Sequence, residues 1–350
     1  MRNVPSFSKR ILKKEFAKTL AYRAGALPAY HLLCNRDTLT VLMFHRVMPA
    51  AERDSAGADP LWTISTELFE AILNFLARHY NPVTLSDVLA SRIGRKALPP
   101  RAVLVTFDDG WRDNLDYAYP LLRRFGMPAA LFASTEILDE KGLCWWQEVI
   151  LWALRTGRRT VRELDPDPGE NGTHAVAEMA PELALLVRYS KLEPSRRTEL
   201  LEPLASELEP RQFRAQMLDS DSLSELAAAG VEIGVHGATH LPLTSLADPA
   251  DDLARSRAKI ALCSKMAQPV SLSFPHGRYD QRVLDAARQL GFKLMFSSES
   301  VVNPCPGGWL ASDILGRIPI YADAVVWSGE QLSAPKLAAW LFRRSLRLTS

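Results

Sequence analysis

Short, nearly continuous apolar runs recur along the 350-residue chain, and each is followed by a turn signal and then by a helix-like pattern. Parallel strands that are covered by helices on both faces have this unbroken apolar character. The seven runs span residues 39–45, 102–109, 128–135, 230–237, 269–277, 292–298 and 316–321. The helical patterns among them cover residues 65–80, 114–126, 220–230, 252–266 and 280–291, and Ser222–Glu225 has the sequence of a capping box.

This alternation predicts an α/β fold, an irregular (β/α)7 barrel one unit short of the common eight, with an open doubly wound sheet as the alternative. Residues 136–221 interrupt this alternation of strand-like and helix-like segments. They predict a helical insertion over one face of the barrel, with a flexible connector at 165–172. We therefore expect a helical N-terminal segment (1–38), a barrel with its insertion (39–324) and a helical C-terminal tail (325–350).

The N-terminal segment reads as a basic amphipathic helix. Residues 8–33 set apolar side chains among lysines and arginines, and residues 335–348 have a similar character. Such a helix either packs on the domain or lies on an anionic membrane surface, and both interpretations stay open. Charges interrupt the segment too often for a secretory signal, and no stretch elsewhere has about 20 apolar residues. We expect a cytoplasmic protein that could be peripheral on the inner membrane.

The composition limits which partners and which structural cross-links can be expected. The chain has 42 Lys and Arg against 40 Asp and Glu, so its net charge gives no reason to expect nucleic acid. The four cysteines are far apart and form no C-x-x-C pair, which argues against a structural zinc knuckle or a disulfide framework.

Residues suited to catalysis directly follow four of the apolar runs. Functional groups of a parallel barrel lie at the carboxyl ends of its strands, so these residues are expected to share one face. They are His45; Asp108 and Asp109; His236 and His240; and Pro275 and His276.

Two adjacent carboxylates repel each other unless a cation or hydrogen bonds take up the charge. One Asp with two His residues supplies three ligands and leaves a tetrahedral site open for water, as in catalytic zinc sites. The other aspartate would then be free to act as a base toward that water, and His45 could protonate a leaving group. Each motif alone has a simpler explanation: Asp-Asp-Gly often caps a helix, H-x-x-x-H arises by chance, and His45 could be a core residue. Their conjunction at strand ends favours the catalytic interpretation.

These residues resemble the polysaccharide deacetylases of the NodB-homology type, carbohydrate esterase family 4. TFDDG (106–110) is similar to the first family motif, and HGATH (236–240) resembles the H-[ST]-x-x-H metal motif, with Gly237 in place of Ser or Thr. Further similarity lies in LMFHRV (42–47) and SFPHG (273–277), and the resemblance covers roughly residues 40–320.

The resemblance implies a hydrolase that uses a divalent metal, usually Zn²⁺ with Co²⁺ or Ni²⁺ as options, to remove acyl groups from N-acylated sugars; no organic cofactor is implied. By position, Asp108 is the base, and Asp109, His236 and His240 are the metal ligands. His45 matches the early catalytic histidine of the branch that includes biofilm poly-N-acetylglucosamine deacetylases.

Other positions depart from the family pattern. His276 replaces a tyrosine whose backbone N–H helps to hold the oxyanion, next to Pro275. The arginine that usually orients the base is missing near Leu272 and Ser273, and Arg278 and Arg317 are the candidates to replace it. Candidates for stacking on a sugar ring, or for core packing instead, are Trp111, Trp145, Trp146 and Trp309.

The resulting prediction is a metal-dependent N-deacetylase of an exopolysaccharide or of its lipid-linked precursor. Two alternatives remain: a non-catalytic carbohydrate-binding barrel, and a deacylase of another amide, such as a formamido sugar on a polyprenyl carrier.

Overall fold

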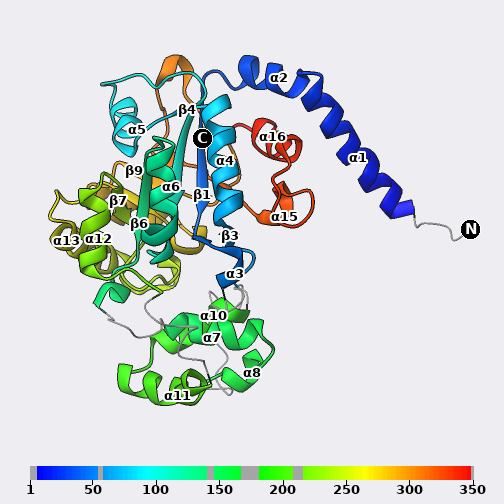
Figure 1. Cartoon of the computed structure of the whole chain (residues 1–350). Coiled ribbons are helices and arrows are strands. Elements are labelled where there is room, and N and C mark those ends of the chain that lie inside the picture. Colours follow the sequence, from blue (N-terminus) through cyan, green and yellow to red (C-terminus); the bar gives the residue numbers. More distant parts are fainter. Residues whose placement is uncertain (1–5, 54–57, 140–145, 167–180, 208–215, 348–350) are drawn as a thin grey trace, which may run out of the picture.

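The computed structural model describes residues 6–53, 58–139, 146–166, 181–207 and 216–347 (Figure 1). Its central sheet is mostly parallel, and each of the seven predicted runs contributes a strand to it. Six strands lie side by side in chain order: β1 (Thr38–Phe44), β5 (Ala102–Phe107), β6 (Ala129–Ala133), β7 (Glu232–Val235), β8 (Ser271–Ser273) and β9 (Leu294–Phe296). Every residue of β1, β5 and β6 is buried, which explains why these strands have no alternating polar positions.

The seventh run and the two-residue strand just before it close most of the gap between β9 and β1. β11 (Ile314–Leu315) pairs in parallel with β9, and β12 (Ile318–Pro319) pairs in parallel with β1. The chain between them passes close to the preceding loop, because a Cβ at Gly316 would lie 2.3 Å from Val301 Cγ2. The predicted (β/α)7-like barrel is therefore confirmed, and the open-sheet alternative is wrong.

Helices surround the sheet at the predicted places. They are α4 (Thr66–His79), α5 (Leu85–Arg92), the π-helical turn η1 (Asn114–Ala118) with α6 (Tyr119–Arg124), α12 (Ser220–Ala228), α13 (Pro249–Ser264) and α14 (Gln281–Gln289). The predicted capping box at Ser222 is wrong. α12 begins earlier, because the carboxylate of Asp219 accepts hydrogen bonds from Ser222 N (2.8 Å) and Ser222 Oγ (2.7 Å) and so caps the helix itself.

Short elements that the pattern did not predict complete the barrel. β2 (Arg46–Met48) pairs with β3 (Thr63–Ser65) beyond the end of β1, β4 (Asn81–Pro82) joins β5, and β10 (Asn303–Pro304) pairs antiparallel with the start of β1. The single turn α3 (Ala50–Arg53) follows β2.

A helical unit occupies the region of the predicted insertion. It contains α7 (Trp146–Arg155), α8 (Val161–Leu164), α10 (Pro181–Ser190) and α11 (Pro194–Ser206), and Figure 1 shows it beside the end of the barrel to which β1 and β6 point. These helices share an apolar cluster of their own, which also takes in Leu241. Most of the predicted connector at 165–172, as well as Trp145 and His174, lies outside the described residues.

Helices at both termini meet on one side of the barrel. α1 (Ser6–Arg23) and α2 (Ala26–Cys34) contact α16 (Ala334–Phe342), which follows the short α15 (Ala322–Val325). Leu27 and His31 of α2 are buried, so the packing interpretation of the N-terminal segment holds for this face of α2. Figure 1 shows α1 extending away from the barrel.

Candidate active site

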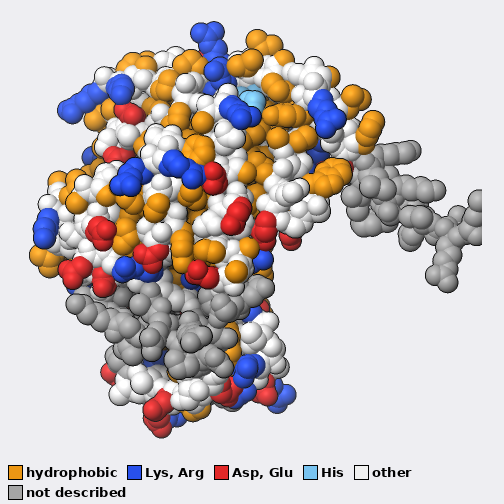
Figure 2. Space-filling model, viewed as in Figure 1, with side chains coloured by type: hydrophobic (Ala, Val, Ile, Leu, Met, Phe, Trp, Pro, Cys, Tyr) orange, Lys and Arg blue, Asp and Glu red, His pale blue; other side chains and the backbone are white. Residues whose placement is uncertain are grey.

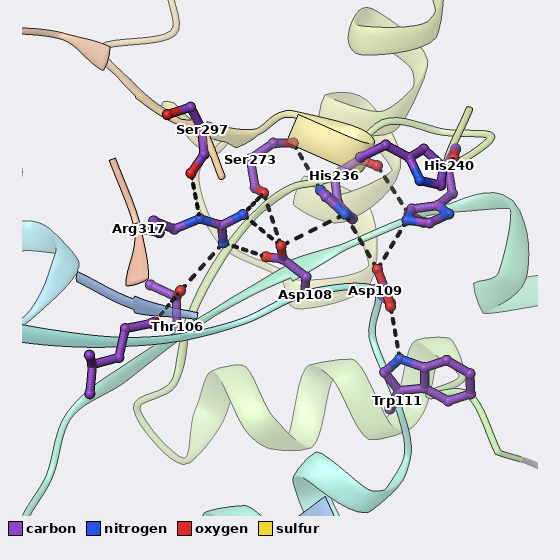
Figure 3. A network of polar contacts seen from close by, with 12 residues as sticks. Thr106, Asp108, Asp109, Trp111, His236, His240, Ser273, Ser297 and Arg317 are labelled. Carbon is purple, nitrogen blue, oxygen red and sulfur yellow. Dashed lines mark hydrogen bonds and ion pairs between the residues drawn. The ribbon is translucent and has the colours of Figure 1, made fainter. Parts of the chain in front are cut away.

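The residues predicted from the strand ends come together at one end of the barrel (Figure 3). His45 follows β1. Asp108 and Asp109 follow β5, His236 follows β7 directly, and His240 lies in the loop after it. The structure has no helix in this loop, which agrees with the prediction of a strand-end loop. Gly237 has φ +73°, and a Cβ there would lie 3.1 Å from Asp252 Oδ1, which explains why glycine occupies a position where the family usually has Ser or Thr.

Asp109, His236 and His240 form a compact set of three potential ligands. Asp109 Oδ1 lies 3.4 Å from His236 Nε2 and 3.1 Å from His240 Nε2. The three ligand atoms all lie within 4.8 Å of one another, and the set is largely buried.

The hydrogen bonds of the two imidazoles determine which nitrogens carry protons. His236 Nδ1 lies 2.9 Å from the carbonyl of Ser273, so Nδ1 donates. His240 Nδ1 lies 3.3 Å from Gln147 Oε1, which is an acceptor because the other end of that amide, Nε2, donates to the Thr239 carbonyl at 2.8 Å. In the neutral rings, both Nε2 lone pairs then face the buried Asp109 Oδ1, which has no hydrogen-bond partner among the described residues. Three acceptors facing one another are satisfied either by a proton on one imidazole, which the raised pKa of His236 beside the two aspartates would favour against its burial, or by a metal ion. One carboxylate with two imidazoles suits a divalent transition metal such as zinc.

The site also holds unusual backbone. Among the described residues, five that are not glycine have φ in the left-handed region, and three of them are Asp109 (75°), His240 (57°) and His276 (55°). Such conformations cost on the order of 1–3 kcal/mol each and persist only where the surroundings enforce them. Their concentration here supports the prediction that the functional site lies at this end of the barrel.

Asp108 has a different partner from its neighbour. Arg317, on the segment between β11 and β12, donates from Nη1 to Oδ1 and from Nη2 to Oδ2 of Asp108, each at 2.7 Å. Burial alone would raise the pKa of Asp108, but the charge and hydrogen bonds of Arg317, together with the charges of His236 and His45, hold the pKa below its usual value. Of the two arginines proposed from the sequence, Arg317 therefore contacts the aspartate.

Arg317 is itself fixed in place. It is buried, its Nε donates to the Ser297 carbonyl (3.2 Å), and its Nη2 also donates to Ser273 Oγ (2.8 Å), as Figure 3 shows. Ser273 stands near the position from which the family's arginine is missing. The guanidinium of Arg317, which comes from the segment between β11 and β12, thus lies beside Asp108.

Trp111 lies beneath the predicted metal site. It is buried, its Nε1 donates to Asp109 Oδ2 at 2.9 Å, and the guanidinium of Arg46 lies 4.1 Å from its ring centroid. Arg46 in turn forms a buried ion pair with Asp113 at 2.8 Å. This geometry favours a role for Trp111 in orienting Asp109 over a role in stacking on a sugar ring.

His45 stands at the edge of the same charged group. Its Nδ1 is buried without a hydrogen-bond partner among the described residues, and its ring centroid lies 4.4 Å from that of Trp62. Burial lowers the pKa of His45, and the charges of Asp109 and Asp108 oppose that change. An unpaired imidazole that interacts with both carboxylates is well placed to transfer a proton to a bound substrate.

Pro275 and His276 form the short helical turn η4 (Pro275–Gly277) after β8. The ring centroids of His276 and His240 are 4.6 Å apart, and His276 Nε2 donates to the His240 carbonyl at 3.0 Å. Burial lowers the pKa of His276 to about 3, so the ring is neutral near pH 7. Arg278 directly follows this turn and is half-buried.

The two remaining described tryptophan candidates differ in position. Trp309 is exposed near α5, where Gly308 O accepts from Leu98 N at 2.8 Å; this is the amino end of the barrel strands, away from the predicted site. Trp146 packs both against the apolar cluster of the insertion and against Trp111, and the guanidinium of Arg197 lies 4.7 Å from its ring centroid.

Two residues of the site were not predicted from the sequence. Trp62, next to His45, precedes the three-residue strand β3, and Gln147 lies on an insertion helix. Neither follows a predicted strand or belongs to a motif, so only the tertiary structure reveals their positions.

Comparison with known proteins agrees with this arrangement. Residues 95–295, more than half of the chain, match the model of the polysaccharide deacetylase family. The chain belongs to this family. The matched range includes four of the six residues proposed for catalysis, metal binding and base orientation, namely Asp108, Asp109, His236 and His240. His45 and Arg317 lie beyond its two ends, so the comparison says nothing of these two.

The chain resembles only a part of each matching curated relative. It is 30% identical over 104 residues to a putative polysaccharide deacetylase of Bacillus subtilis, YxkH, which is 29% of this chain and 34% of that protein. It is 28% identical over 85 residues to the poly-β-1,6-N-acetyl-D-glucosamine N-deacetylase of Escherichia coli K12, which is 20% of this chain and 13% of that protein. The chain therefore spans about a third or less of the length of these relatives.

Solved structures share the fold of this deacetylase family member at low sequence identity. The Streptococcus pyogenes deacetylase PplD, in complex with acetate, superposes with a TM-score of 0.56 at 16% identity, over 87% of this chain and 99% of that one. IcaB from Ammonifex degensii gives 0.55 at 20% identity, over 87% and 97%. These similarities support the barrel fold.

Proposed function

We propose that this protein is a metal-dependent N-deacetylase that removes acetyl groups from the amino sugars of an exopolysaccharide or of its lipid-linked precursor. The observation that carries the proposal is the pairing of two adjacent aspartates with different partners. Asp109 faces two imidazole lone pairs, and Asp108 is held by the guanidinium of Arg317. Membership of the polysaccharide deacetylase family supports the reaction class.

Asp109, His236 and His240 are the proposed ligands of one divalent ion, with zinc the first candidate and Co²⁺ or Ni²⁺ as alternatives. Such an ion would polarise the amide carbonyl and lower the pKa of a water molecule at the site. Trp111 would hold the second oxygen of Asp109 and so fix which oxygen faces the ion.

Asp108 and His45 then divide the proton transfers. Asp108 takes a proton from the attacking water as the new C–O bond forms, and Arg317 keeps that carboxylate ionised and oriented. When the C–N bond breaks, His45 gives a proton to the departing sugar nitrogen, and the products are acetate and the free amine. For this step His45 must carry a proton. Burial lowers the pKa of His45, and the charges of Asp109 and Asp108 oppose that change and so favour the protonated form.

Backbone around Pro275 and His276 is the proposed partner of the oxyanion. The left-handed conformation of His276 turns the chain sharply after β8, next to His240. A backbone donor tolerates the change from tyrosine to histidine. Arg278, which follows this turn, is proposed as a substrate-binding residue.

Two other functions remain to be separated from this one. A binding-only barrel has no need of a guanidinium-held carboxylate beside an intact set of ligands, so the geometry favours an enzyme. A deacylase of another amide, such as a formamido sugar, would use the same residues. Acyl specificity therefore has to be measured.

The test is a substrate panel with mass-spectrometric detection of the released acid. Purified protein loaded with Zn²⁺ or Co²⁺ is incubated with N-acetylglucosamine oligomers and with lipid-linked N-acetyl and N-formyl amino sugars. We expect acetate from the N-acetyl substrates, and loss of release in Asp108→Asn and His45→Ala. Formate alone would establish the alternative amide, and no acid from any substrate would favour the binding-only barrel.

Peripheral contact with an anionic membrane through the terminal helices is part of the proposal. Phe16, Leu20 and Leu33 are 69%, 59% and 79% exposed, and α2 has no charged residue. In the view of Figure 2, apolar and basic side chains lie together at the upper end of the molecule, and acidic side chains lie mostly below them. No helix among the described residues is long and apolar enough to cross a membrane. Basic segments are attracted to the anionic cytoplasmic leaflet, which is the proposed location.

A further inference from the structure

His240 is the most exposed of the three proposed metal ligands. Its side chain is 12% exposed, compared with 9% for Asp109 and 3% for His236. It also has the left-handed backbone conformation that side chains rarely adopt, with φ 57°. A ligand in this conformation depends on its neighbours for its position.

The helical insertion supplies one of these neighbours. Gln147 lies in the first turn of α7 and is 1% exposed. Its amide joins two points of the His240 loop, because Nε2 donates to the Thr239 carbonyl at 2.8 Å and Oε1 lies 3.3 Å from His240 Nδ1. The second contact fixes the tautomer of His240 and leaves its Nε2 directed at Asp109.

Apolar packing holds the same loop from its other side. Leu241, the residue after His240, is 2% exposed and belongs to the apolar cluster of the insertion, together with Val149 of α7. The segment around the ligand is therefore fixed partly by the insertion and partly by the barrel, where His276 donates to the His240 carbonyl at 3.0 Å.

We infer that the helical insertion is a structural part of the metal site: Gln147 is a positioning residue for His240, so that ion binding and packing of α7 stabilise each other. The inference rests on the proposed metal site and adds to it the role of the insertion. Because coupling between two events is reciprocal, whatever the insertion contributes to metal affinity, the metal contributes to the stability of the insertion.

The coupling predicts two effects in the full-length protein. Gln147→Ala should weaken Co²⁺ binding by about 10- to 100-fold, the range seen when an outer partner of a metal ligand is removed. Gln147→Glu keeps an acceptor for His240 Nδ1–H and should recover part of that loss. In the wild type, Co²⁺ should slow amide hydrogen exchange across α7, and in Gln147→Ala this protection should largely disappear.

The experiment is a Co²⁺ titration of the metal-free protein in competition with a chelator, followed by visible absorption, with hydrogen exchange measured by mass spectrometry in parallel. Val149→Ala is the matched control, because it loosens the packing of α7 but keeps the Gln147 amide that contacts His240. We expect it to speed exchange in α7 and to weaken Co²⁺ binding clearly less than Gln147→Ala does.

The outcomes separate this inference from the proposed function. Wild-type affinity in Gln147→Ala, or equal losses in Gln147→Ala and Val149→Ala, would overturn the role of Gln147 and leave the metal site standing. Unchanged Co²⁺ binding in Asp109→Ala would place the ion elsewhere and overturn both.

Discussion

Asp108 and Asp109 are adjacent in sequence but are bound by different groups. The left-handed conformation of Asp109 turns its side chain toward two histidines, while Asp108 meets the guanidinium of Arg317. Two like charges can stay ionised side by side when each has its own counter-charge, which is the Arg317 guanidinium for Asp108 and the proposed metal ion for Asp109. The separate surroundings are the physical basis for assigning them separate roles.

Replacing Arg317 should affect the base and leave the metal ligands intact. In Arg317→Leu the burial of Asp108 is no longer opposed by a guanidinium, so its pKa rises and a larger fraction is protonated at pH 7. We expect kcat to fall by about 100-fold or more and the acidic limb of the kcat profile to move to higher pH. The pH profile of acetate release, with metal content measured alongside, checks this.

Arg278 supplies the control for that prediction. Arg278→Leu removes the other arginine considered for this role, and the acidic limb should stay where it is in the wild type. A shift of equal size in both variants would contradict the specific role of Arg317.

Trp111 should influence the metal more than the sugar. Trp111→Phe keeps the buried ring and removes the hydrogen bond to Asp109 Oδ2, so we expect metal affinity to fall by about 10-fold with little change in KM under saturating metal. Chelator competition and steady-state kinetics measure the two quantities. A raised KM with unchanged metal affinity would restore the stacking role instead.

At the scale of elements, α2 is held by a histidine that must stay neutral. His31 Nε2 donates to the His79 carbonyl (3.1 Å), its Nδ1 accepts from Asn35 Nδ2 (3.0 Å), and its ring stacks on Phe342 at 4.0 Å. Burial lowers the pKa of His31 from 6.5 to about 4. A proton on Nδ1 would face the Asn35 donor, so protonation should loosen α2 from the barrel.

The sign of the pH dependence follows from that lowered pKa. Because the unfolded chain binds the proton more readily, the contribution of neutral His31 is fully present above pH 6.5 and is lost as the pH falls toward 4. The contribution of neutral His31 to the free energy of unfolding is at most about 3 kcal/mol. We expect the difference in unfolding free energy between the wild type and His31→Leu to change in this direction between pH 7 and 4. A constant difference would contradict the assignment.

The outer faces of α1 and α2 should govern membrane binding. Phe16→Ser combined with Leu33→Ser removes two exposed apolar side chains, and we expect at least a 10-fold loss of binding to vesicles that contain phosphatidylglycerol. Leu262→Ser is the matched control, since Leu262 is 75% exposed on α13. Equal losses in both variants, or no binding by the wild type, would contradict the proposed contact.

At the scale of the whole molecule, the barrel could be predicted because its buried parallel strands appear as unbroken apolar runs. The polar residues after those runs could be placed on one face, because the carboxyl ends of parallel strands lie at the same end of a barrel. Arg317 remained one of two candidates, since its contact with Asp108 depends on how β11 and β12 close the barrel. Gln147 and Trp62 could not be predicted, because an insertion helix and a loop bring them to the site through tertiary packing alone.

The arrangement also limits how substrate could reach the site on a membrane. α2 ends just before β1 and the site lies just after it, so the two are separated by the length of a seven-residue strand, about 20 Å. Docking through α2 would keep the site away from the lipid surface. This geometry suits an extended sugar chain better than a single sugar attached directly to the lipid.

The central claim is that one divalent ion at Asp109, His236 and His240 works with Asp108 as the base. Its most direct test is a titration of metal-free protein with Co²⁺ while acetate release from an N-acetylglucosamine oligomer is followed. The account predicts that release reaches its maximum at one ion per chain. It also predicts that Asp109→Ala loses both binding and release, and that Asp108→Asn binds the ion and releases almost no acetate. Full release without metal, or wild-type release by Asp108→Asn, would contradict the account.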